Sequence, residues 1–535
     1  MKDTILVNGC DAFNAQGKEQ DAWRDAAPES KQIRREVLAQ VRRVFQFLEF
    51  EEDSRRFQET EKGLIGSLFT LGRLFLAYYL AWREEHSRRD VNHFRRQGFC
   101  GGPRQSRKIG TYFGPVRYWR TYLRRSGSKS GGIYPLDLAL GLTGDGFSML
   151  VMSLAARLST HLPFDHVTGF LVAFLSWSPS KTTVEKAVLG FGQYTEEWFE
   201  QAPPPEGDGP VLVIQIDSKA APTAREEELR RRRGRRRNTQ LPKSPRHRGR
   251  AQRRRRGPRP RRKKGDKSKN GRAVTVVVMY TLRPHRTGNG KQMLLGPINR
   301  KVYASFGRKR LAFAAARREA NKRGFTAASG RRIQIVTDGE LAFETCVGEF
   351  FPEALHTVDI YHVFEYLWKA GECLYKEGSE ELAEWVERQK KRLYAGEANK
   401  VVSQLKRRLR GFPKTGPGNK GKRKRLAQAI GYLGRRVDLM CYDDLIEEDL
   451  EIASGSVEGA IKHIVAKRFD NGGMRWIPER AQALLQLRCI EFNGDWEAFV
   501  SFVHDKIMAR ARSELTATRL LTKHATPIPG EERAA

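Results

Sequence analysis

The chain lacks the cysteine patterns that hold small metal-binding or disulfide-rich domains together. Its 535 residues contain six cysteines, and no two of them form a Cys-x-x-Cys pair. This excludes the usual zinc ribbon and gives no sign of a disulfide framework, so a reducing cytoplasm is the expected compartment. The first twenty residues also lack a basic stretch followed by an apolar run, so no secretory signal is expected. No repeat of 20–50 residues recurs along the sequence.

Long apolar runs are scarce, and a single segment, residues 63–82, has the length of a transmembrane helix. Arg73 lies at its centre, where a charge costs about 2.5–3.5 kcal/mol on membrane-insertion scales. Both flanks are dense in charged residues of mixed sign. We therefore predict a buried helix here and no membrane association.

Acidic residues are too few to balance the basic ones, and the net charge is +36 with a pI near 10.2. A chain of this charge is attracted to polyanions, of which nucleic acid is the commonest. Half of the segment 225–272 is Lys or Arg, with almost no apolar residues. Such a segment cannot offset its ordering entropy by burial. We predict a disordered arm that binds nucleic acid without sequence specificity, the alternative being a solvated insertion.

The hydrophobic pattern divides the chain into regions of different character. Residues 1–204 carry mainly helical periodicity, and we predict a DNA-binding and assembly region there. From 205 to 365 the pattern is that of an α/β domain, with apolar β-prone runs at 211–217, 273–282, 301–306 and 331–339 and a short strand running into a helix across 354–375. Helical patterns then return, and we predict a helical insertion (366–450), core helices (451–505) and a tail (506–535).

Three carboxylates stand at informative positions in this pattern. Asp217 ends the first buried strand and Asp338 ends the fourth. If these strands are parallel neighbours, both acids lie at one edge of the sheet, where ligand sites of α/β proteins occur. Glu458 opens a later helix that could bring it to the same edge. Each acid has a plainer reading: a strand-end cap for Asp217, a turn former for Asp338, and a partner of the helix dipole for Glu458.

Taken together, the three acids predict a metal site. Carboxylates that converge on a small volume repel one another unless a cation lies between them, and oxygen ligands suit Mg²⁺ or Mn²⁺. Two such ions can activate a water or a 3′-hydroxyl and stabilise the leaving oxygen of a phosphodiester displacement. We expect the carboxylates of Asp217, Asp338 and Glu458 to lie within reach of one or two shared ions.

Four segments of the sequence carry a resemblance to a known family. They are "VIQIDSKA", "QIVTDGELAFE", "FPEALHTVDIYHVFEYLW" and "SGSVEGAIKHIVAKRFDNGGMRW". Their order over about 205–505 resembles the DDE transposases of bacterial insertion sequences, specifically the ISKra group, which is related to Mutator-like transposases. The resemblance implies an RNase H-like core, a mixed five-stranded sheet with flanking helices and a helical insertion. It implies strand cleavage at terminal inverted repeats and transfer of the 3′ ends to target DNA.

Carried over by position, the resemblance makes Asp217, Asp338 and Glu458 the catalytic, metal-binding triad. The motif "DIYH" places Asp359 and His362 near the site, to contact DNA or orient the scissile phosphate; a helix-face histidine is the plainer reading of His362. The resemblance also implies DNA contacts, to phosphates or a flipped base, from four residues of the last segment: Lys462, Arg468, Arg475 and Trp476. A solvated basic helix with a core tryptophan is the alternative.

The chain departs from the family pattern in two places. It has no cysteine pairs for an N-terminal zinc element, and Asp470 and Asn471 stand where more basic character is expected. The resemblance further implies a bacterial, nucleoid-associated protein that acts as a dimer or larger assembly on DNA. Two alternatives remain open: an RNase H-like nuclease that hydrolyses without joining, and a domesticated nucleic-acid-binding protein that has lost catalysis.

Overall fold

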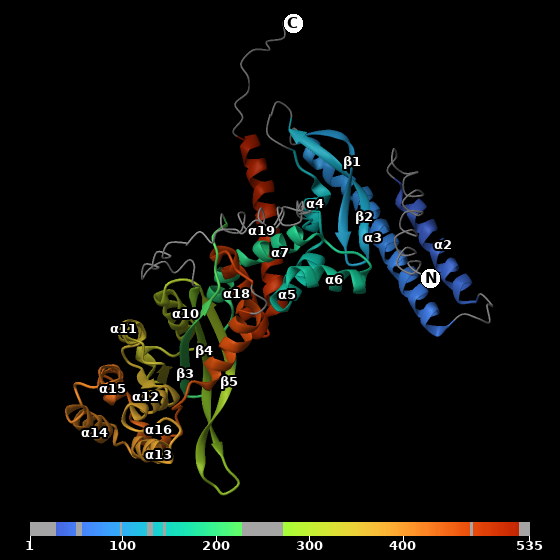
Figure 1. Cartoon of the computed structure of the whole chain (residues 1–535). Coiled ribbons are helices and arrows are strands. Elements are labelled where there is room, and N and C mark those ends of the chain that lie inside the picture. The colour runs from blue at the N-terminus through green and yellow to red at the C-terminus, as the bar shows by residue number, and fades with distance from the viewer. Residues whose placement is uncertain are drawn as a thin grey trace, which may run out of the picture. The chain divides into compact units, whose positions relative to one another are not determined.

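The computed structural model describes residues 28–49, 56–96, 99–125, 132–142, 146–226, 271–470 and 474–523. The chain forms two compact units (Figure 1), of which the first combines Met1–Phe191 with Glu497–Ala535 and the second is Gly192–Trp496. Most of the predicted basic arm, residues 227–270, lies outside the described residues. The three acids of interest all belong to the second unit.

The first unit is mainly helical and contains one antiparallel hairpin, β1 (Phe99–Thr111) with β2 (Gly114–Arg125). The hairpin is held to the next helix by Asp137, which is 7% exposed. This carboxylate accepts a hydrogen bond of 2.6 Å from the Tyr118 hydroxyl and pairs with Arg107 and Arg120. The helices are α2 (Ser30–Leu48), α3 (Phe57–Arg96), α4 (Pro135–Leu140), α5 (Met149–His161), α6 (Phe164–Leu175), α7 (Lys181–Gly192) and α19 (Trp496–Lys523).

Helix α3 corrects the prediction of a buried helix at 63–82. The helix is covered only in part: Leu80 packs with Ile109 and Val116 of the hairpin, and α2 also packs on α3. Several of its large apolar side chains are exposed, among them Leu68 at 50% and Phe75 at 51%. By length and composition alone, α3 could cross a membrane. Arg73 is accommodated inside the apolar stretch because its guanidinium donates a hydrogen bond to the Phe113 carbonyl, at 2.9 Å.

The prediction that a tail begins at residue 506 is also wrong, because residues 506–523 belong to helix α19. The sequence from 496 to 523 contains no Gly or Pro, so nothing in it interrupts helical backbone geometry. The remaining predicted tail, 524–535, lies outside the described residues.

The second unit contains the predicted mixed five-stranded sheet, which is confirmed. Its strands lie in the order β5-β4-β3-β6-β7. β4 pairs antiparallel with both β3 and β5, whereas β6 pairs parallel with both β3 and β7. Continuous runs of Val and Ile make the central strands because both faces of the sheet are covered. The bounds are β3 (Val211–Ala221), β4 (Arg272–Arg286), β5 (Gln292–Ser305), β6 (Arg332–Thr337) and β7 (Leu355–Val358).

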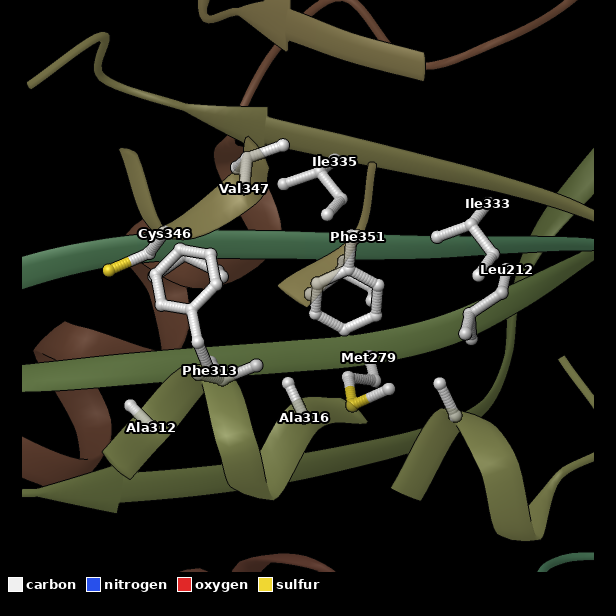
Figure 2. Close-up of a cluster of buried hydrophobic side chains, with 14 of the residues drawn as sticks. Leu212, Met279, Ala312, Phe313, Ala316, Ile333, Ile335, Cys346, Val347 and Phe351 are labelled. Carbon is white, nitrogen blue, oxygen red and sulfur yellow. The ribbon is translucent and has the colours of Figure 1, made fainter. Parts of the chain in front are cut away.

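One face of the sheet carries the main hydrophobic core (Figure 2), formed with α10 (Lys309–Lys322) and α11 (Leu341–Phe350). Ile214 and Ile216 of β3 and Ile335 of β6 face these helices. Phe313 of α10 and other aromatic side chains fill the space between. Because side chains alternate along a strand, the residues between these isoleucines face the opposite side.

The opposite face is covered by elements that come later in the chain. They are α12 (Ile360–Leu374), α17 (Gly455–Ala460), the π-helix η4 (Ile461–Asp470) and α18 (Pro478–Phe492). α17 and η4 both contact β3. Asn493, at the end of α18, exchanges two hydrogen bonds with the Val302 backbone of β5. The predicted single helix after Gly455 therefore begins as an α-helix and continues as a π-helix. A short helix, α8 (Thr195–Gln201), precedes the sheet.

Helices fill the predicted insertion between β7 and α17 and lie together at one end of the unit (Figure 1). Their bounds are α13 (Glu380–Tyr394), α14 (Ala398–Arg410), α15 (Asn419–Gly434) and α16 (Tyr442–Glu447). α15 packs on α12 through stacked rings of Tyr366 and Tyr432, whose centroids are 3.7 Å apart. The Tyr442 hydroxyl donates to the Val358 carbonyl at 2.8 Å, which fixes α16 against the end of β7.

Candidate active site

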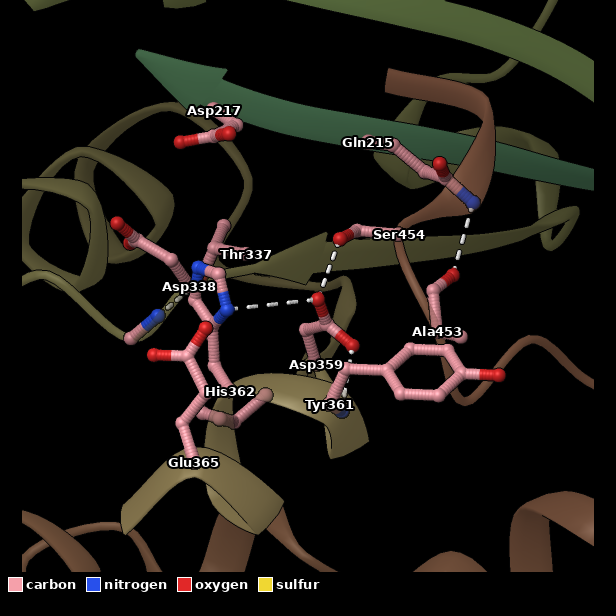
Figure 3. Close-up of polar contacts among 12 residues, drawn as sticks. Gln215, Asp217, Thr337, Asp338, Asp359, Tyr361, His362, Glu365, Ala453 and Ser454 are labelled. Atoms are coloured by element: carbon pink, nitrogen blue, oxygen red, sulfur yellow. Dashed lines mark hydrogen bonds and ion pairs between the residues drawn. The ribbon is translucent and has the colours of Figure 1, made fainter. Parts of the chain in front are cut away.

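Asp217 and Asp338 lie side by side where the pairing of β3 with β6 ends. β3 itself continues to Ala221, so Asp217 lies within this strand, which corrects the prediction that it ends the strand, whereas Asp338 directly follows β6. In the parallel pair of β3 and β6, Ile216 is paired with Thr337, so the two acids occupy the next position on adjacent strands. Adjacent strands lie about 4.8 Å apart. Side chains alternate along a strand, and Ile216 and Ile335 face the main core. Asp217 and Asp338 therefore face the opposite side of the sheet, toward α12 and α17. Figure 3 shows the two carboxylates there together with His362.

Burial raises the pKa of both carboxyls. For Asp217, burial acts first; the charges of Asp338 and Glu458 raise the pKa further, and the Ser218 amide and His362 oppose the rise. Burial also dominates the raised pKa of Asp338, with an opposing hydrogen bond from the Glu340 amide. These two acids are therefore crowded negative groups, which a cation would stabilise in the ionised form.

Glu458 reaches this edge because a buried glutamine of β3 holds the start of its helix. The Gln215 side chain accepts a hydrogen bond from the Val457 amide and donates to the Ala453 carbonyl, both at 3.0 Å. It also donates to the Tyr280 hydroxyl at 2.9 Å. Glu458 follows Val457 directly and is exposed. Its charge contributes to the raised pKa of Asp217, so it lies within electrostatic reach of that acid.

The predicted convergence of all three acids on shared ions is not present in the side-chain arrangement. Within the part of the chain that the structure describes, no group of three or more His, Cys, Asp or Glu is arranged to hold a metal ion. Carboxylates repel one another unless a cation lies among them, so a spread arrangement is what they adopt by themselves. The donor set, two neighbouring aspartates and a nearby glutamate, is nevertheless of the all-oxygen type that suits Mg²⁺ or Mn²⁺.

Replacing Gln215 with methionine tests how far this glutamine positions Glu458. The change leaves the Ala453 carbonyl without its Gln215 donor, which costs about 1–3 kcal/mol, whereas the Val457 amide keeps the Ser454 carbonyl as an acceptor at 3.1 Å. We expect a lower unfolding midpoint and, where the variant is still folded, a loss of the metal-dependent cleavage of DNA proposed below. Gln389→Met is the matched control, since Gln389 is equally buried but lies in α13, away from the acids. Wild-type cleavage by folded Gln215→Met would contradict this role.

A second glutamine makes the same kind of contact one strand away. Gln334 of β6 donates to the Glu451 carbonyl at 2.6 Å and accepts from the Glu451 amide at 3.0 Å. The segment 451–457 is thus held by one buried amide side chain on each of the two central strands. The position of Glu458 is set by these contacts together with the short length of α17.

Asp359 is a positioning residue, which corrects the prediction that it contacts DNA. It is fully buried, and its Oδ1 accepts the Tyr361 amide at the start of α12. Its Oδ2 accepts the Ser454 hydroxyl, so it joins α12 to the segment that carries Glu458 (Figure 3). His362 is 31% exposed, and its Nδ1 lies 3.9 Å from Asp359 Oδ2. Its charge acts on both Asp217 and Asp338, so it lies within electrostatic reach of both acids, and its predicted role at the site stays a prediction.

The turn that carries Asp338 is held by the end of α15. The Tyr432 hydroxyl donates to the Asp338 carbonyl, and Arg436 Nε donates to the Gly339 carbonyl, each at 2.7 Å. Arg436 is 2% exposed and pairs with Glu344 of α11 at 2.8 Å. The helical insertion therefore contributes directly to the placement of a candidate catalytic acid.

His356 of β7 gives the fold near this turn a pH dependence. Its Nε2 lies 2.9 Å from Thr337 Oγ1, and burial, with a smaller effect from Arg436, lowers its pKa to about 4. The unfolded chain binds this proton near pH 6.5, so the stability that the neutral ring provides is lost as the pH falls from 6.5 through 4. We expect a loss of about 3 kcal/mol across this window. His356→Gln, measured by unfolding at pH 7 and pH 4.5, should show a smaller loss; an equal loss would contradict this assignment.

Arg468 is structural, which corrects its predicted DNA contact, whereas Trp476 is partly exposed and its predicted DNA contact stays a prediction. Arg468 is 2% exposed, and its guanidinium lies over the Trp476 ring, 4.7 Å from the centroid. Burial lowers its pKa to about 10, with a contribution from Arg488. The Trp476 amide donates to the Pro222 carbonyl, and its own carbonyl accepts the Ala224 amide, so it anchors the chain beyond β3.

The other two predicted DNA contacts, Lys462 and Arg475, are exposed and remain predictions. Asp470, which had no explanation in the sequence, has a partner: its Oδ2 lies 3.7 Å from Nζ of Lys219 on β3. Both side chains are more than a third exposed, so this pair is worth at most about 1 kcal/mol.

Sequence reasoning missed Gln215, Gln334, Tyr432 and Arg436 as positioning residues. A signal was available for the two glutamines. Each interrupts an otherwise apolar strand, "VLVIQID" and "RIQIVT", where an amide is costly unless it is fully hydrogen-bonded. No comparable signal marks Tyr432 or Arg436, because their contacts join residues about 95 positions apart.

Comparisons with known proteins give little beyond this geometry. No protein-family model and no curated protein sequence matches the chain. Among solved structures, the chain is similar to one described as "Drosophila P element transposase strand transfer complex", with 11% sequence identity. The match covers 67% of this chain and 96% of that one, and its TM-score is 0.29. A TM-score this low does not establish a common fold, so the proposals below rest on this chain's own residues.

Proposed function

We propose that the protein is a DNA transposase of a bacterial insertion sequence, with an RNase H-like core and a DDE triad. One observation carries the proposal: Asp217 and Asp338 are register neighbours on parallel strands, and the Gln215 contact brings the helix of Glu458 to the same edge. Acids in this arrangement suit phosphodiester chemistry on a polyanion, and a chain of net charge +36 is attracted to one.

In this proposal, Asp217, Asp338 and Glu458 hold two Mg²⁺ or Mn²⁺ ions, which supply activation of the attacking hydroxyl and stabilisation of the leaving oxygen. The protein's own part is to hold the three carboxylates in place through Gln215, Gln334 and Asp359. Lys462 and Arg475 would bind the phosphates beside the reacting bond. Lysine and arginine contacts of this kind position DNA without reading its sequence.

The proposal extends to the biological setting. The protein would act on the terminal inverted repeats of its own element and join their 3′ ends to target DNA. Since two ends must be brought together, it would work as a dimer or larger assembly on the bacterial nucleoid. Short inverted repeats and a direct target duplication in the DNA flanking the gene would support this setting, and their absence would count against it.

The decisive experiment is strand cleavage and joining of labelled end DNA with Mg²⁺ or Mn²⁺. Cleavage followed by joining is the expected result. Hydrolysis without joining would favour an RNase H-like nuclease on the same core. DNA binding without cleavage, unchanged by loss of the triad acids, would favour a domesticated nucleic-acid-binding protein.

A further inference from the structure

The helical insertion carries a surface of one charge sign that the site described above does not include. Residues 398–437 contain thirteen Lys or Arg and no Asp or Glu. They form α14, a loop, α15 and the three residues after it, and we call residues 398–437 the basic hairpin. The hairpin is well defined: Arg423 of α15 donates to the carbonyls of Leu409 and Phe412 at the end of α14, at 2.8 and 3.0 Å.

The apolar and basic residues of the hairpin lie on different sides. Val401, Val402 and Leu405 of α14 are buried, as are Leu426 and Ile430 of α15. Six of the exposed basic residues recur at spacings that return to the same side of each helix, and we call these six the stripe; Arg408 and Arg425 are exposed at other positions. The stripe consists of Lys406, Arg407 and Arg410 on α14 and of Lys420, Lys424 and Arg435 on or next to α15.

These six cations differ from the basic residues of the neighbouring helix. On α13, Arg388 and Lys390 pair with Glu384 and Glu387 of the same helix. None of the six stripe residues forms an ion pair with any residue that the structure describes. A solvated helix surface in a stable protein usually interleaves both signs of charge, since like charges at neighbouring positions are destabilising. Uncompensated repulsion of this kind is relieved by an anionic partner.

One end of the stripe lies next to the turn that carries Asp338, and the other end lies away from it. Arg435, at its inner end, directly precedes Arg436, whose guanidinium holds the Asp338 turn. α15 has sixteen residues and is therefore about 24 Å long. Phosphates of one DNA strand recur about every 3.4 Å along the helix axis, so this length matches about seven of them. The stripe thus begins beside the acids and leads away from them.

We propose that the basic hairpin binds the phosphate backbone of double-stranded DNA, which it guides toward the acidic edge of the sheet. The inference rests on the proposed function for its direction but concerns a separate surface. Binding through lysine and arginine to phosphate is independent of base sequence and strongly dependent on salt. It also links DNA contact to the Asp338 turn, since α15 carries both.

The first test locates the contact in the full chain without any catalysis. Lysine acetylation is measured by mass spectrometry with chelator present, with and without a saturating 30-base-pair DNA duplex. We expect protection of Lys406, Lys420 and Lys424, while the ion-paired Lys369 and Lys390 react as before. Protection confined to lysines of the segment 225–272 would overturn the proposal, as would protection by duplex RNA and not by DNA.

The second test measures the charge dependence. In one variant, Lys406, Arg407, Arg410, Lys420 and Lys424 are changed to Gln. The matched control removes five positive charges that have acidic partners, by changing Arg310, Arg332, Lys369, Arg388 and Lys390 to Gln. We expect the hairpin variant to reduce the magnitude of the slope of log K against log salt by about 4.5, since each of the five phosphate contacts contributes about 0.9. Equal slopes in the two variants would overturn the proposal.

Cleavage assays separate this inference from the proposed function. Loss of the hairpin charges should raise the DNA concentration needed for half-maximal cleavage and leave the saturated rate nearly unchanged. If wild-type protein cleaves DNA but the hairpin lysines stay unprotected, the hairpin proposal fails and the proposed function stands. If the lysines are protected but no cleavage occurs in any divalent ion, the proposed function fails and the hairpin proposal stands.

Discussion

Asp217→Asn is expected to reduce strand cleavage by about a thousandfold or more while DNA binding is retained. The carboxylate of Asp217 lies next to that of Asp338, and its loss removes one of the oxygen ligands that would hold the catalytic ions. Such ions stabilise the transition state by several kcal/mol, and each 1.4 kcal/mol corresponds to a factor of about ten in rate. The measurement is single-turnover cleavage of labelled end DNA with Mg²⁺, beside a binding isotherm in chelator.

A control for charge is available at the same edge of the sheet. Asp470→Asn removes one negative charge near β3, where Asp470 pairs with Lys219. It should change cleavage by no more than a few-fold, because this exposed pair contributes at most about 1 kcal/mol. Asp338→Asn and Glu458→Gln should behave as Asp217→Asn does. Full activity of Asp217→Asn, or an equal loss in Asp470→Asn, would refute the assignment of the triad.

Gly339→Ala is expected to damage both the fold and the site, although it adds only a methyl group. Gly339 has a φ of +70°, and a Cβ there would lie 2.5 Å from Arg436 Nε. Arg436 cannot move aside freely, since it is 2% exposed and holds both Gly339 and Glu344. Left-handed backbone costs a non-glycine residue about 1–2 kcal/mol, and overpacking adds about 1–3 kcal/mol. The displaced turn would carry Asp338 out of position, so cleavage should fall even where the variant is folded.

Gly378 provides the matched control for this change. Its φ is +76°, but no atom lies within 4 Å of the position that a Cβ would take. Gly378→Ala therefore carries the backbone strain without the clash, and it should lower stability by about 1–2 kcal/mol with normal cleavage. A double-mutant cycle of Gly339→Ala with Arg436→Ala should show a coupling of about 1–2 kcal/mol. Equal behaviour of the two glycine variants would contradict a role for Arg436 in holding the turn.

The sequence carries strong signals for the sheet and for the position of its acids. The runs "VLVIQID", "AVTVVVMYTL" and "RRIQIVTDG" correspond to β3, β4 and β6 because a strand buried on both faces must be continuously apolar. An acid directly after such a run stands out, so the amino-acid pattern alone singles out Asp217 and Asp338. The parallel pairing of β3 and β6 is a condition of that prediction, and it is confirmed.

The wrong predictions concern residues whose charge or hydropathy suggests one environment while their place on the helix gives them another. The charge of Arg468 favours a DNA contact, although this residue follows Ile461 and Ile464 at helical spacing and so belongs to the buried side. The hydropathy of the segment 63–82 favours burial, but large apolar side chains of α3 such as Leu68 and Phe75 are exposed. Charge and hydropathy of single residues do not say which side of a helix is covered.

The sequence by itself determined the order of strands and helices along the chain, the two aspartates directly after apolar runs, and the excess of positive charge. These follow from local hydrophobic period and composition, which short-range physics ties to local structure. Only the tertiary structure decided what holds the acids in place: Gln215 and Gln334 on the segment before Glu458, Asp359 on Ser454, and Tyr432 and Arg436 on the Asp338 turn. Each of these hydrogen bonds joins residues about 90 or more positions apart, and their formation depends on how elements pack in space, which no local pattern encodes.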